Sequence, residues 1–529
     1  MSLPMLLVGL LLAPAHAQEI NLRNANLYYA VDDVRVQLPG IPLELERVYN
    51  SRFNYNGYFG YGWTTNLDIR SQDAPDGAVV VTDSDGFQLY FMPQGMTRQR
   101  MKERFIQSLV KARKDQDQRL GQERGAQYYT DMAAKLASDD AFFDQTSYNT
   151  MSGWIQPAAG DYISFDRGTE RMKRSSDGTV VRTRSDGSRF TFGPGGKLQS
   201  YVDVGGRGLE LSYDRDGQLV KVGHTEGGQI ALTYTADRRI ATILDTEGRR
   251  IEYGYSPTGD LVSVKGPSPR QLAYAYDDEH NLVAAREADG AGFQISYDKR
   301  RDWARAIKVG EDVTKYAWAV QSNDQYSCQV IAPDGATTVH SFDDANHRQV
   351  TEFPDGTTEE TLLSECCAKP LEVRTEAGVT RYDYDRDARL TGVQYPDGRE
   401  VRFSYHPQWS RIVQAMHSDG RRYSYTYDGF GNLVEAVDGA SRVLKLRYGD
   451  NGKVEAVRDQ DGHDYRFTYD DYGRPTEISR GSDGALSIAY GLGGEIASTE
   501  IAGGDGSVDF YAELREVLSM LEPATGELQ

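Results

Sequence analysis

The chain has 529 residues, with 59 basic and 79 acidic side chains and a formal net charge of -20. A net negative surface repels phosphate backbones and anionic lipid headgroups, so nucleic acid and membrane surfaces are disfavoured as partners. The 34 Tyr and 54 Gly, beside 18 Pro, favour many short strands joined by tight turns over a helical protein.

The first 17 residues, MSLPMLLVGLLLAPAHA, form a short apolar run that ends in the small-x-small triplet Ala15-His16-Ala17. This pattern predicts a signal peptide over residues 1–17 and a mature start at Gln18. The run is too short to span a bilayer comfortably, so we expect no stable membrane insertion. We therefore expect export to the periplasm, the cell surface or the extracellular space.

Residues 18–95 are predicted to form an N-terminal β domain. They contain three β-type segments, LPGIPLELERVYNSR, FGYGW and DGAVVVTDSDGFQLYF. The two glycines of FGYGW (59–63) favour a bend that buries Trp63. An aromatic platform for a ligand is the alternative interpretation of this motif.

Residues 96–150 interrupt the β pattern with a charged, glycine-poor segment. Met101, Phe105 and Leu109 form an apolar stripe at helical spacing, and Tyr128, Met132 and Leu136 repeat it. We predict two helices inserted between β elements. They would pack against the β structure or dock a partner.

Residues 151–505 carry a strong internal repeat. Anchor residues recur along this segment, and twelve of the fourteen intervals between them are 21 residues. The anchors are Phe192, Tyr213, Tyr234, Tyr255, Tyr276, Tyr297, Trp318, Phe342, Leu363, Tyr384, Tyr405, Tyr427, Tyr448, Tyr469 and Tyr490.

Each repeat has the pattern of a two-stranded hairpin. Positions two and four before an anchor are usually apolar, which indicates a strand with one buried face. Apolar residues six and nine positions after it, such as Leu219 and Val222, break plain alternation and suggest a bulge in the second strand. Lone hairpins are marginally stable, so we predict one long antiparallel sheet that twists into a curved or spiral β-shell.

The consensus Y-D-x-x-G-x-L-x-x-V-x-D-x-x-G resembles the YD repeat of the RHS family. YDRDGQLVKVGHTEGG (213–228), YDGFGNLVEAVDGAS (427–441) and YGDNGKVEAVRDQDG (448–462) carry it most clearly. The three segments of residues 18–95 are similar to the RHS-associated domain that precedes the repeats in many exported members. The resemblance implies a hollow β-shell, and relatives are linked to carbohydrate binding at cell surfaces, intercellular competition and toxin encapsulation.

Residues 506–529 are predicted to form a C-terminal helix and tail. Phe510, Leu514, Val517 and Leu521 share one stripe, which would cover the end of the array. Larger RHS proteins carry an aspartyl self-cleavage motif and a variable toxin after the repeats. Neither is recognised here, so we do not expect a toxin activity in this chain.

The sequence offers few candidates for chemistry. Cys328, Cys366 and Cys367 allow a bridge from Cys328 to either neighbour, a vicinal bridge, or buried free thiols. Carboxylate pairs such as Asp214 with Asp216 fit hairpin turns better than calcium loops. We predict no catalytic, cofactor-binding or metal residues and no cofactor.

The main hypothesis is an exported, non-enzymatic scaffold that binds or encloses a carbohydrate or a polypeptide. The polypeptide would be an effector or a second shell chain. The alternatives are a delivery component for a separately encoded toxin and a secreted carbohydrate-active hydrolase.

Overall fold

The computed structural model describes residues 18–53, 55–166, 169–266, 271–365, 368–470, 473–490, 496–502 and 507–521. It contains two compact units: the described residues up to Leu67 and from Tyr201 onward, and Asp68–Ser200. The predicted signal peptide lies outside the described residues. The domain boundaries predicted at residues 95, 150 and 505 stay predictions about how the sequence is organised.

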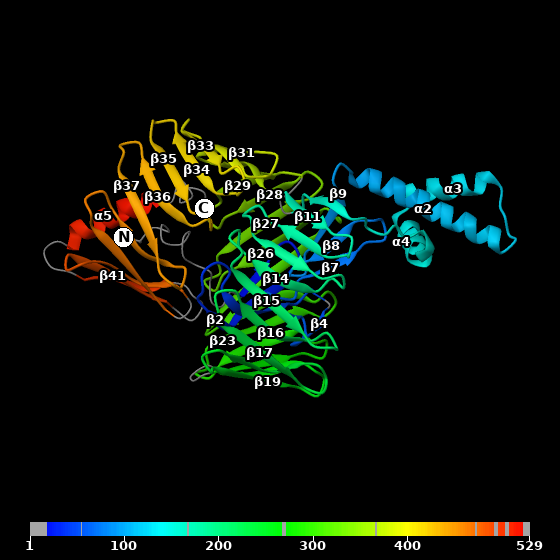
Figure 1. Ribbon diagram of the computed structural model, residues 1–529, viewed down its shortest axis with the longest axis horizontal. Helices are drawn as coiled ribbons and strands as arrows, with labels where there is room; N and C mark the ends of the chain where they lie inside the picture. The colour runs from blue at the N-terminus through cyan, green and yellow to red at the C-terminus, as the bar shows by residue number, and fades with distance from the viewer. Residues whose placement is uncertain are drawn as a thin grey trace. The chain divides into compact units, whose positions relative to one another are not determined.

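The unit Asp68–Ser200 contains an antiparallel sheet and a group of helices. Its strands pair in chain order: β7 (Arg70–Asp73), β8 (Val79–Thr82), β9 (Gln88–Pro93), β10 (Gly160–Ser164), β11 (Glu170–Arg174), β12 (Val180–Thr183) and β13 (Arg189–Phe192). The helices leave the sheet between β9 and β10: α2 (Arg98–Arg119), α3 (Ala126–Ser138), α4 (Asp140–Asn149) and the 3-10 turn η2 (Met151–Gly153). Figure 1 shows these helices in blue and cyan.

The helical insertion is confirmed, with one more helix than predicted. Phe105 and Leu109 of α2 are buried against Leu136 of α3, as the apolar stripes indicated. The second predicted helix is divided at Asp139, whose carboxylate accepts the amide of Phe142 at 2.9 Å and begins α4. An aspartate in this position satisfies an amide that a new helix leaves unpaired.

The larger unit begins with a small sheet in the order β1 (Gln18–Asn21), β2 (Asn26–Val36), β3 (Leu43–Asn50) and β6 (Trp63–Thr65), beside the short hairpin β4 (Asn56–Gly57) and β5 (Gly60–Tyr61). Gly60 and Gly62 have φ of +100° and +73°. A Cβ on Gly62 would lie 2.6 Å from the ring of Tyr49. Trp63 is 0% exposed, which confirms the predicted bend around a buried tryptophan.

The repeats form consecutive antiparallel strands, as predicted. β14 (Leu198–Val202) carries the chain from one unit to the other. The first strands that follow are β15 (Gly208–Tyr213), β16 (Leu219–His224), β17 (Gln229–Tyr234), β18 (Ile240–Asp245), β19 (Arg250–Tyr255), β20 (Leu261–Lys265), β21 (Gln271–Tyr276), β22 (Leu282–Glu287), β23 (Gly292–Asp298), β24 (Trp303–Val309), β25 (Asp312–Val320), β26 (Gln325–Ile331), β27 (Thr337–Asp343) and β28 (Arg348–Glu352).

The second half of the array continues in the same way and ends in the predicted C-terminal helix α5 (Ser507–Leu521). Figure 1 shows these strands running in chain order from green to orange. They are β29 (Thr358–Leu363), β30 (Pro370–Thr375), β31 (Gly378–Tyr384), β32 (Leu390–Gln394), β33 (Glu400–Tyr405), β34 (Ile412–His417), β35 (Arg422–Tyr427), β36 (Leu433–Asp438), β37 (Val443–Tyr448), β38 (Val454–Arg458), β39 (Asp464–Tyr469), β40 (Pro475–Arg480), β41 (Gly484–Tyr490) and β42 (Ile496–Ala502).

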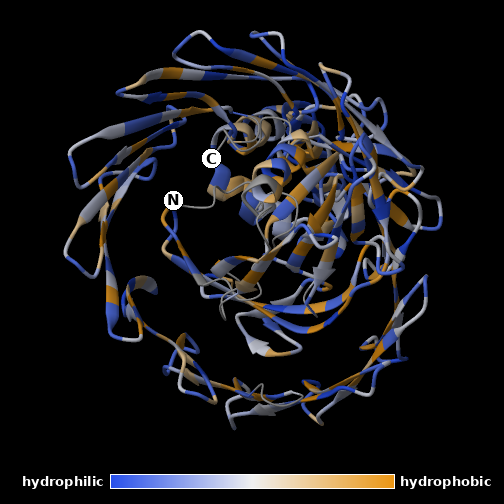
Figure 2. Cartoon of the chain, turned by 90° about the vertical axis from the view of Figure 1, so that its left-hand side faces the viewer, coloured by the Kyte–Doolittle hydropathy of each residue, from blue (hydrophilic) through white to orange (hydrophobic). Residues whose placement is uncertain are grey.

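One face of this repeat sheet, which we call the anchor face, packs against the N-terminal sheet. Arg47 of β3 is 0% exposed and donates to Asp33 Oδ1 at 2.9 Å, while Tyr253 of β19 donates to Asp33 Oδ2 at 2.6 Å. The Arg47 guanidinium also lies over the Trp63 ring, 4.8 Å from its centroid. Figure 2 shows the alternation of hydrophobic and hydrophilic residues along the strands that this packing requires.

The array winds back around the N-terminal sheet. His224 of β16 donates Nε2 to Ile41 O at 2.8 Å, and Pro39 of the same loop contacts Gly452, which follows β37. Early and late turns of the array also meet directly, since the Arg207 guanidinium lies 3.9 Å from the centroid of the Phe430 ring. These contacts confirm the curved antiparallel repeat sheet within this unit.

Candidate functional site

The tyrosine anchors share one hydrogen bond that links neighbouring hairpins. In eight of these anchors the hydroxyl donates, at 2.6–3.0 Å, to the backbone carbonyl 15 residues earlier. Burial raises the pKa of Tyr405, Tyr448 and Tyr490 to about 12, so these hydroxyls stay protonated donors. The bonds join Tyr234 to Leu219, Tyr255 to Ile240, Tyr297 to Leu282, Tyr405 to Leu390, Tyr427 to Ile412, Tyr448 to Leu433, Tyr469 to Val454 and Tyr490 to Pro475.

The accepting carbonyl lies at a β-bulge. Tyr213 pairs with Leu219 and Ser212 with Lys221, so Val220 is the extra residue, and the same register shift recurs in later hairpins. This confirms the bulge that the spacing of the apolar residues suggested. A bulge disrupts the ladder, and the next anchor's hydroxyl supplies a partner to a carbonyl there. This need for a hydroxyl explains why Tyr recurs at the anchor position.

The hairpins β25–β28 depart from this scheme. Their strands pair without a register shift. The anchors here are Trp318 and Phe342, at the 24-residue interval in the sequence. Trp318 donates its indole Nε1 to Ala304 O at 2.8 Å, while Phe342 lacks a donor. The 24-residue interval between these anchors therefore coincides with hairpins whose strands pair without a bulge.

The repeated aspartates cap the hairpin turns. Asp214 accepts the Gln218 amide at 2.8 Å, and Asp428 accepts the Asn432 amide at 2.9 Å. Asp470 also forms an ion pair with Arg474 at 2.7 Å, four residues later in the same turn. These bonds give the recurring Asp a structural role in forming the turn. Within the described residues no group of three or more His, Cys, Asp or Glu is arranged to hold a metal ion.

Helix α5 covers the anchor face of β35–β41. Phe510 and Leu514 are 0% and 1% exposed and pack with Leu444, Tyr465 and Ile478 of the sheet. The Tyr425 hydroxyl donates to Met520 O at 3.2 Å. All four residues of the predicted apolar stripe are buried, which confirms it.

Two features show how closely α5 fits this face. A Cβ on Gly484 of β41 would lie 2.7 Å from the Phe510 ring, so the glycine permits the approach. Ion pairs of Arg442 with Glu516 and of Arg480 with Glu513 flank the apolar contact.

The same face of β25–β28 is open by comparison. Cys328, Phe342 and Thr351 on this face are buried, but most of the other side chains are half-exposed and Val320 is 49% exposed. Leu444 and Val457 beneath α5 are 2% and 0% exposed. We call this surface the open face. Its accessible residues are Thr314, Tyr316, Trp318, Val320, Tyr326, Val330, Thr338, His340 and Gln349, which the strand register places on one side together with the buried Cys328, Phe342 and Thr351.

The open face is aromatic and carries no Asp, Glu, Lys or Arg among these nine residues. Burial lowers the pKa of His340, which favours its neutral form. Tyr316 and Trp318 stack with their centroids 6.4 Å apart. On the opposite face, Arg348 pairs with Glu360 at 2.5 Å. Sequence periodicity predicted aromatic residues on one face but could not show which stretch would remain exposed.

Cys328 lies at the centre of β26 as a free thiol that is 0% exposed. Burial raises its pKa to about 12, which makes it a poor nucleophile at neutral pH. Cys366 and Cys367 lie outside the described residues, so the disulfide pairing stays a prediction. None of the helices in the described part of the chain is long and apolar enough to cross a membrane.

Comparison with solved structures gives distant matches. The crystal structure of TcdB2-TccC3 without its hypervariable C-terminal region matches 65% of this chain and 25% of that chain, at 11% identity and a TM-score of 0.36. A Tc holotoxin pore of Photorhabdus luminescens matches 74% of this chain and 29% of that chain, at 10% identity and a TM-score of 0.37. The chain thus spans less than a third of the length of each.

Two family models match the sequence, and no curated protein does. A domain of unknown function designated DUF6531 matches residues 17–91. The RHS repeat matches residues 409–443, which contain the anchor Tyr427 and its hairpin. The sequence thus carries an RHS repeat and, before it, a DUF6531 domain, in agreement with the resemblance of the repeats and of the N-terminal segments.

Proposed function

We propose that this protein is a non-enzymatic scaffold that holds an amphipathic or apolar polypeptide segment against the anchor face of its repeat sheet. The observation that carries the proposal is the packing of α5. This helix buries Phe510, Leu514 and Val517 against anchor-face side chains. The chain thus uses this face to bind one of its own segments.

The open face offers a continuation of the same surface to a second segment. It has the aromatic character of the face beneath α5 and lacks the acidic and basic side chains that would oppose apolar contact. Tyr and Trp provide large contact areas at low entropic cost. The occupant we propose is an apolar segment of another polypeptide, such as a separately encoded effector.

The setting we propose is outside the cytoplasm. The signal-peptide pattern of residues 1–17 supports export, and the RHS family supports a role in cell-surface interaction or intercellular competition. N-terminal sequencing of the secreted protein tests this part. A mature chain beginning at Gln18 is expected, and a retained Met1 in exported material would contradict it.

The binding proposal is tested with a defined unfolded polypeptide, fluorescently labelled reduced and carboxymethylated lactalbumin. Val320→Glu and Tyr316→Glu place a charge on the open face. The matched controls Ala319→Glu and Lys315→Glu alter neighbouring, exposed positions on the opposite face of the same strand. We expect the open-face variants to lose at least about ten-fold in affinity, since a carboxylate must be desolvated in the contact.

Equal affinities of the open-face and control variants would contradict this assignment. Absence of binding by the unaltered protein would also contradict it. Circular dichroism and urea midpoints of all four variants establish that each one is folded before the affinities are compared.

A further inference from the structure

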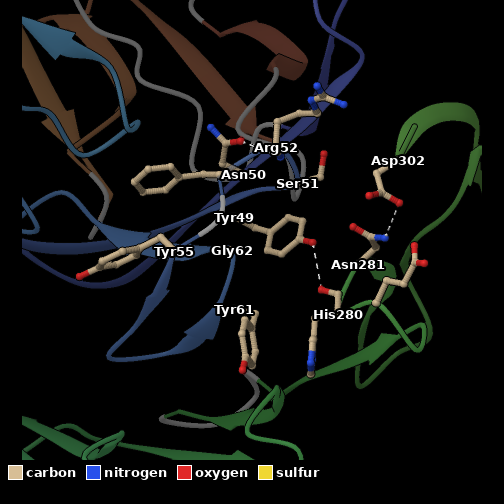
Figure 3. Close-up of a pocket in the computed structure, with 12 residues that line it drawn as sticks. Tyr49, Asn50, Ser51, Arg52, Tyr55, Tyr61, Gly62, His280, Asn281 and Asp302 are labelled. Carbon is tan, nitrogen blue, oxygen red and sulfur yellow. Dashed lines mark hydrogen bonds between the residues drawn. The ribbon is translucent and has the colours of Figure 1, made fainter. Parts of the chain in front are cut away.

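A cavity of about 380 Å³ lies where the end of β3 meets two turns of the repeat array. One wall is formed by residues 49–53 and 61–62 of the N-terminal segment. The other is formed by 279–281, which follow β21, and by Asp302, which precedes β24. Figure 3 shows side chains from both walls facing the same space. The volume lies within the range of about 300–1,000 Å³ that is usual for small-molecule sites.

The floor of this cavity is held in place by hydrogen bonds. Tyr49 is 1% exposed, accepts the Leu282 amide at 2.9 Å and donates to His280 O at 3.4 Å. Asn281 is 6% exposed and donates to Asp302 Oδ1 at 3.2 Å. Figure 3 marks the Tyr49–His280 and Asn281–Asp302 bonds with dashed lines. The site is therefore organised before any ligand arrives.

Aromatic rings line the cavity in two stacked pairs. Tyr61 stacks on His280 with centroids 3.9 Å apart, and Phe53 stacks on Tyr55 with centroids 5.3 Å apart. These rings line the space, and the almost fully buried Tyr49 lies beneath it. Such ring faces attract an organic cation through their quadrupoles.

The charged groups at the rim favour the same ligand. Glu279 and Asp302 line the cavity, and among the described residues neither forms an ion pair with Lys or Arg. A hydrogen bond with Asp302 and the neighbouring acidic charges raise the pKa of Glu279. Arg52 directs Nη1 to Arg301 O at 2.8 Å. The two acidic side chains thus form a hydrogen-bonded pair, and a cation placed beside it would favour its ionised form.

We propose that this cavity binds an organic ammonium group, held between the rings of Tyr55 and Tyr61 and neutralised by Glu279 and Asp302. The group could come from a free quaternary amine or from a lysine side chain of a polypeptide. This site is separate from the open face and does not depend on the function proposed for it.

The test compares choline with its neutral isostere 3,3-dimethyl-1-butanol, using saturation-transfer NMR and calorimetric titration on the full chain. The two ligands have the same shape and differ in charge, so choline should bind at least about ten-fold more tightly. Glu279→Gln should weaken choline binding by about ten-fold. Glu311→Gln, a carboxylate that is 98% exposed in a different turn, should leave it unchanged.

A second pair of variants tests the role of the rings. Tyr61→Phe preserves the stack on His280 and should retain binding, whereas Tyr61→Ala should lose it. Tighter binding of Nα-acetyl-lysine methylamide than of choline would identify a polypeptide lysine as the source. The reverse order would identify a free quaternary amine, and either order supports the site.

Equal binding of choline and its isostere would overturn the proposal. Unchanged affinity of Glu279→Gln would also overturn it, as would binding of glucose with no binding of either cation. Val320→Glu on the open face should leave choline binding intact. Failure of the two proposals can therefore be distinguished.

Discussion

The anchor face beneath α5 and the open face of β25–β28 are built from the same repeat and differ in what lies on them. Under α5, Leu444 and Ile478 are 2% and 0% exposed, whereas Val320 on the open face is 49% exposed. The hairpins beneath α5 carry bulges and tyrosine hydroxyl bonds, while β25–β28 pair regularly. In this chain, the docking of α5 buries one part of the anchor face and leaves another part more exposed.

The largest effect on stability is expected from removing the buried ion pair where the N-terminal sheet packs on the repeat sheet. Arg47→Ala leaves Asp33 as a buried, uncompensated charge and should lower the free energy of unfolding by about 3–5 kcal/mol. The matched control is Arg23→Ala. Its ion pair with Asp344 also joins the N-terminal segment to the array, but the two side chains are 37% and 44% exposed. That variant should lose no more than about 1 kcal/mol.

These two variants are compared by urea denaturation followed by circular dichroism. Similar losses in Arg47→Ala and Arg23→Ala would show that the buried ion pair does not hold the N-terminal sheet in place.

The second effect concerns α5 itself. Leu514→Ala removes a side chain that is 1% exposed and should weaken docking of the helix by about 2–5 kcal/mol. Limited proteolysis should then cleave within α5 much faster than in the unaltered protein. Arg515→Ala, on the exposed side of the helix, serves as the control and should cleave at the original rate. Equal rates for both variants would contradict the docking of α5 through its apolar stripe.

A smaller effect distinguishes the anchors from the tyrosines of the open face. Tyr427→Phe removes the hydroxyl bond to Ile412 O (2.7 Å) and should lower stability by about 0.5–1.5 kcal/mol. Tyr316→Phe on the open face should change stability by less than this, because no hydrogen bond of its hydroxyl to a described residue is present. Urea midpoints check the pair. A larger loss in Tyr316→Phe would refute the role assigned to the anchor hydroxyl.

The smallest effect is expected at Cys328. Its pKa is raised to about 12 by burial, so the reactive thiolate remains scarce from pH 7 to pH 9. In a Cys366→Ser, Cys367→Ser background, iodoacetamide should add no mass to the folded protein over this range. The same reagent should label the protein fully in urea. Rapid labelling without urea would show that β26 opens more readily than the packing implies.

Much of the fold could be predicted from the sequence because the relevant interactions are local and repeated. The spacing of Tyr213, Leu219 and Val222 indicated the hairpin and its bulge before the strand register showed both. The division of the helices at Asp139 also has a local cause, since Asp139 caps the first turn of α4. The apolar stripe alone did not indicate this division.

The candidate sites could not be predicted in the same way. Tyr61 and His280 are far apart in the sequence and meet only because the array winds around the N-terminal sheet. The FGYGW motif predicts the bend that is observed, and its Tyr61 also lines the cavity. The alternative interpretation of the motif as a ligand platform stays a prediction. The open face depends equally on long-range docking, because α5 and the N-terminal sheet bury parts of the aromatic face that the repeats build.

The most direct test of the central claim is site-specific photo-crosslinking to the unfolded lactalbumin probe. p-Benzoylphenylalanine at Tyr316 lies on the open face, and the same group at Ala317 lies one residue away on the opposite face. The account predicts a crosslinked product from position 316 and little or none from position 317. Equal crosslinking at both positions, or none at position 316, would contradict the claim that the anchor face binds polypeptides.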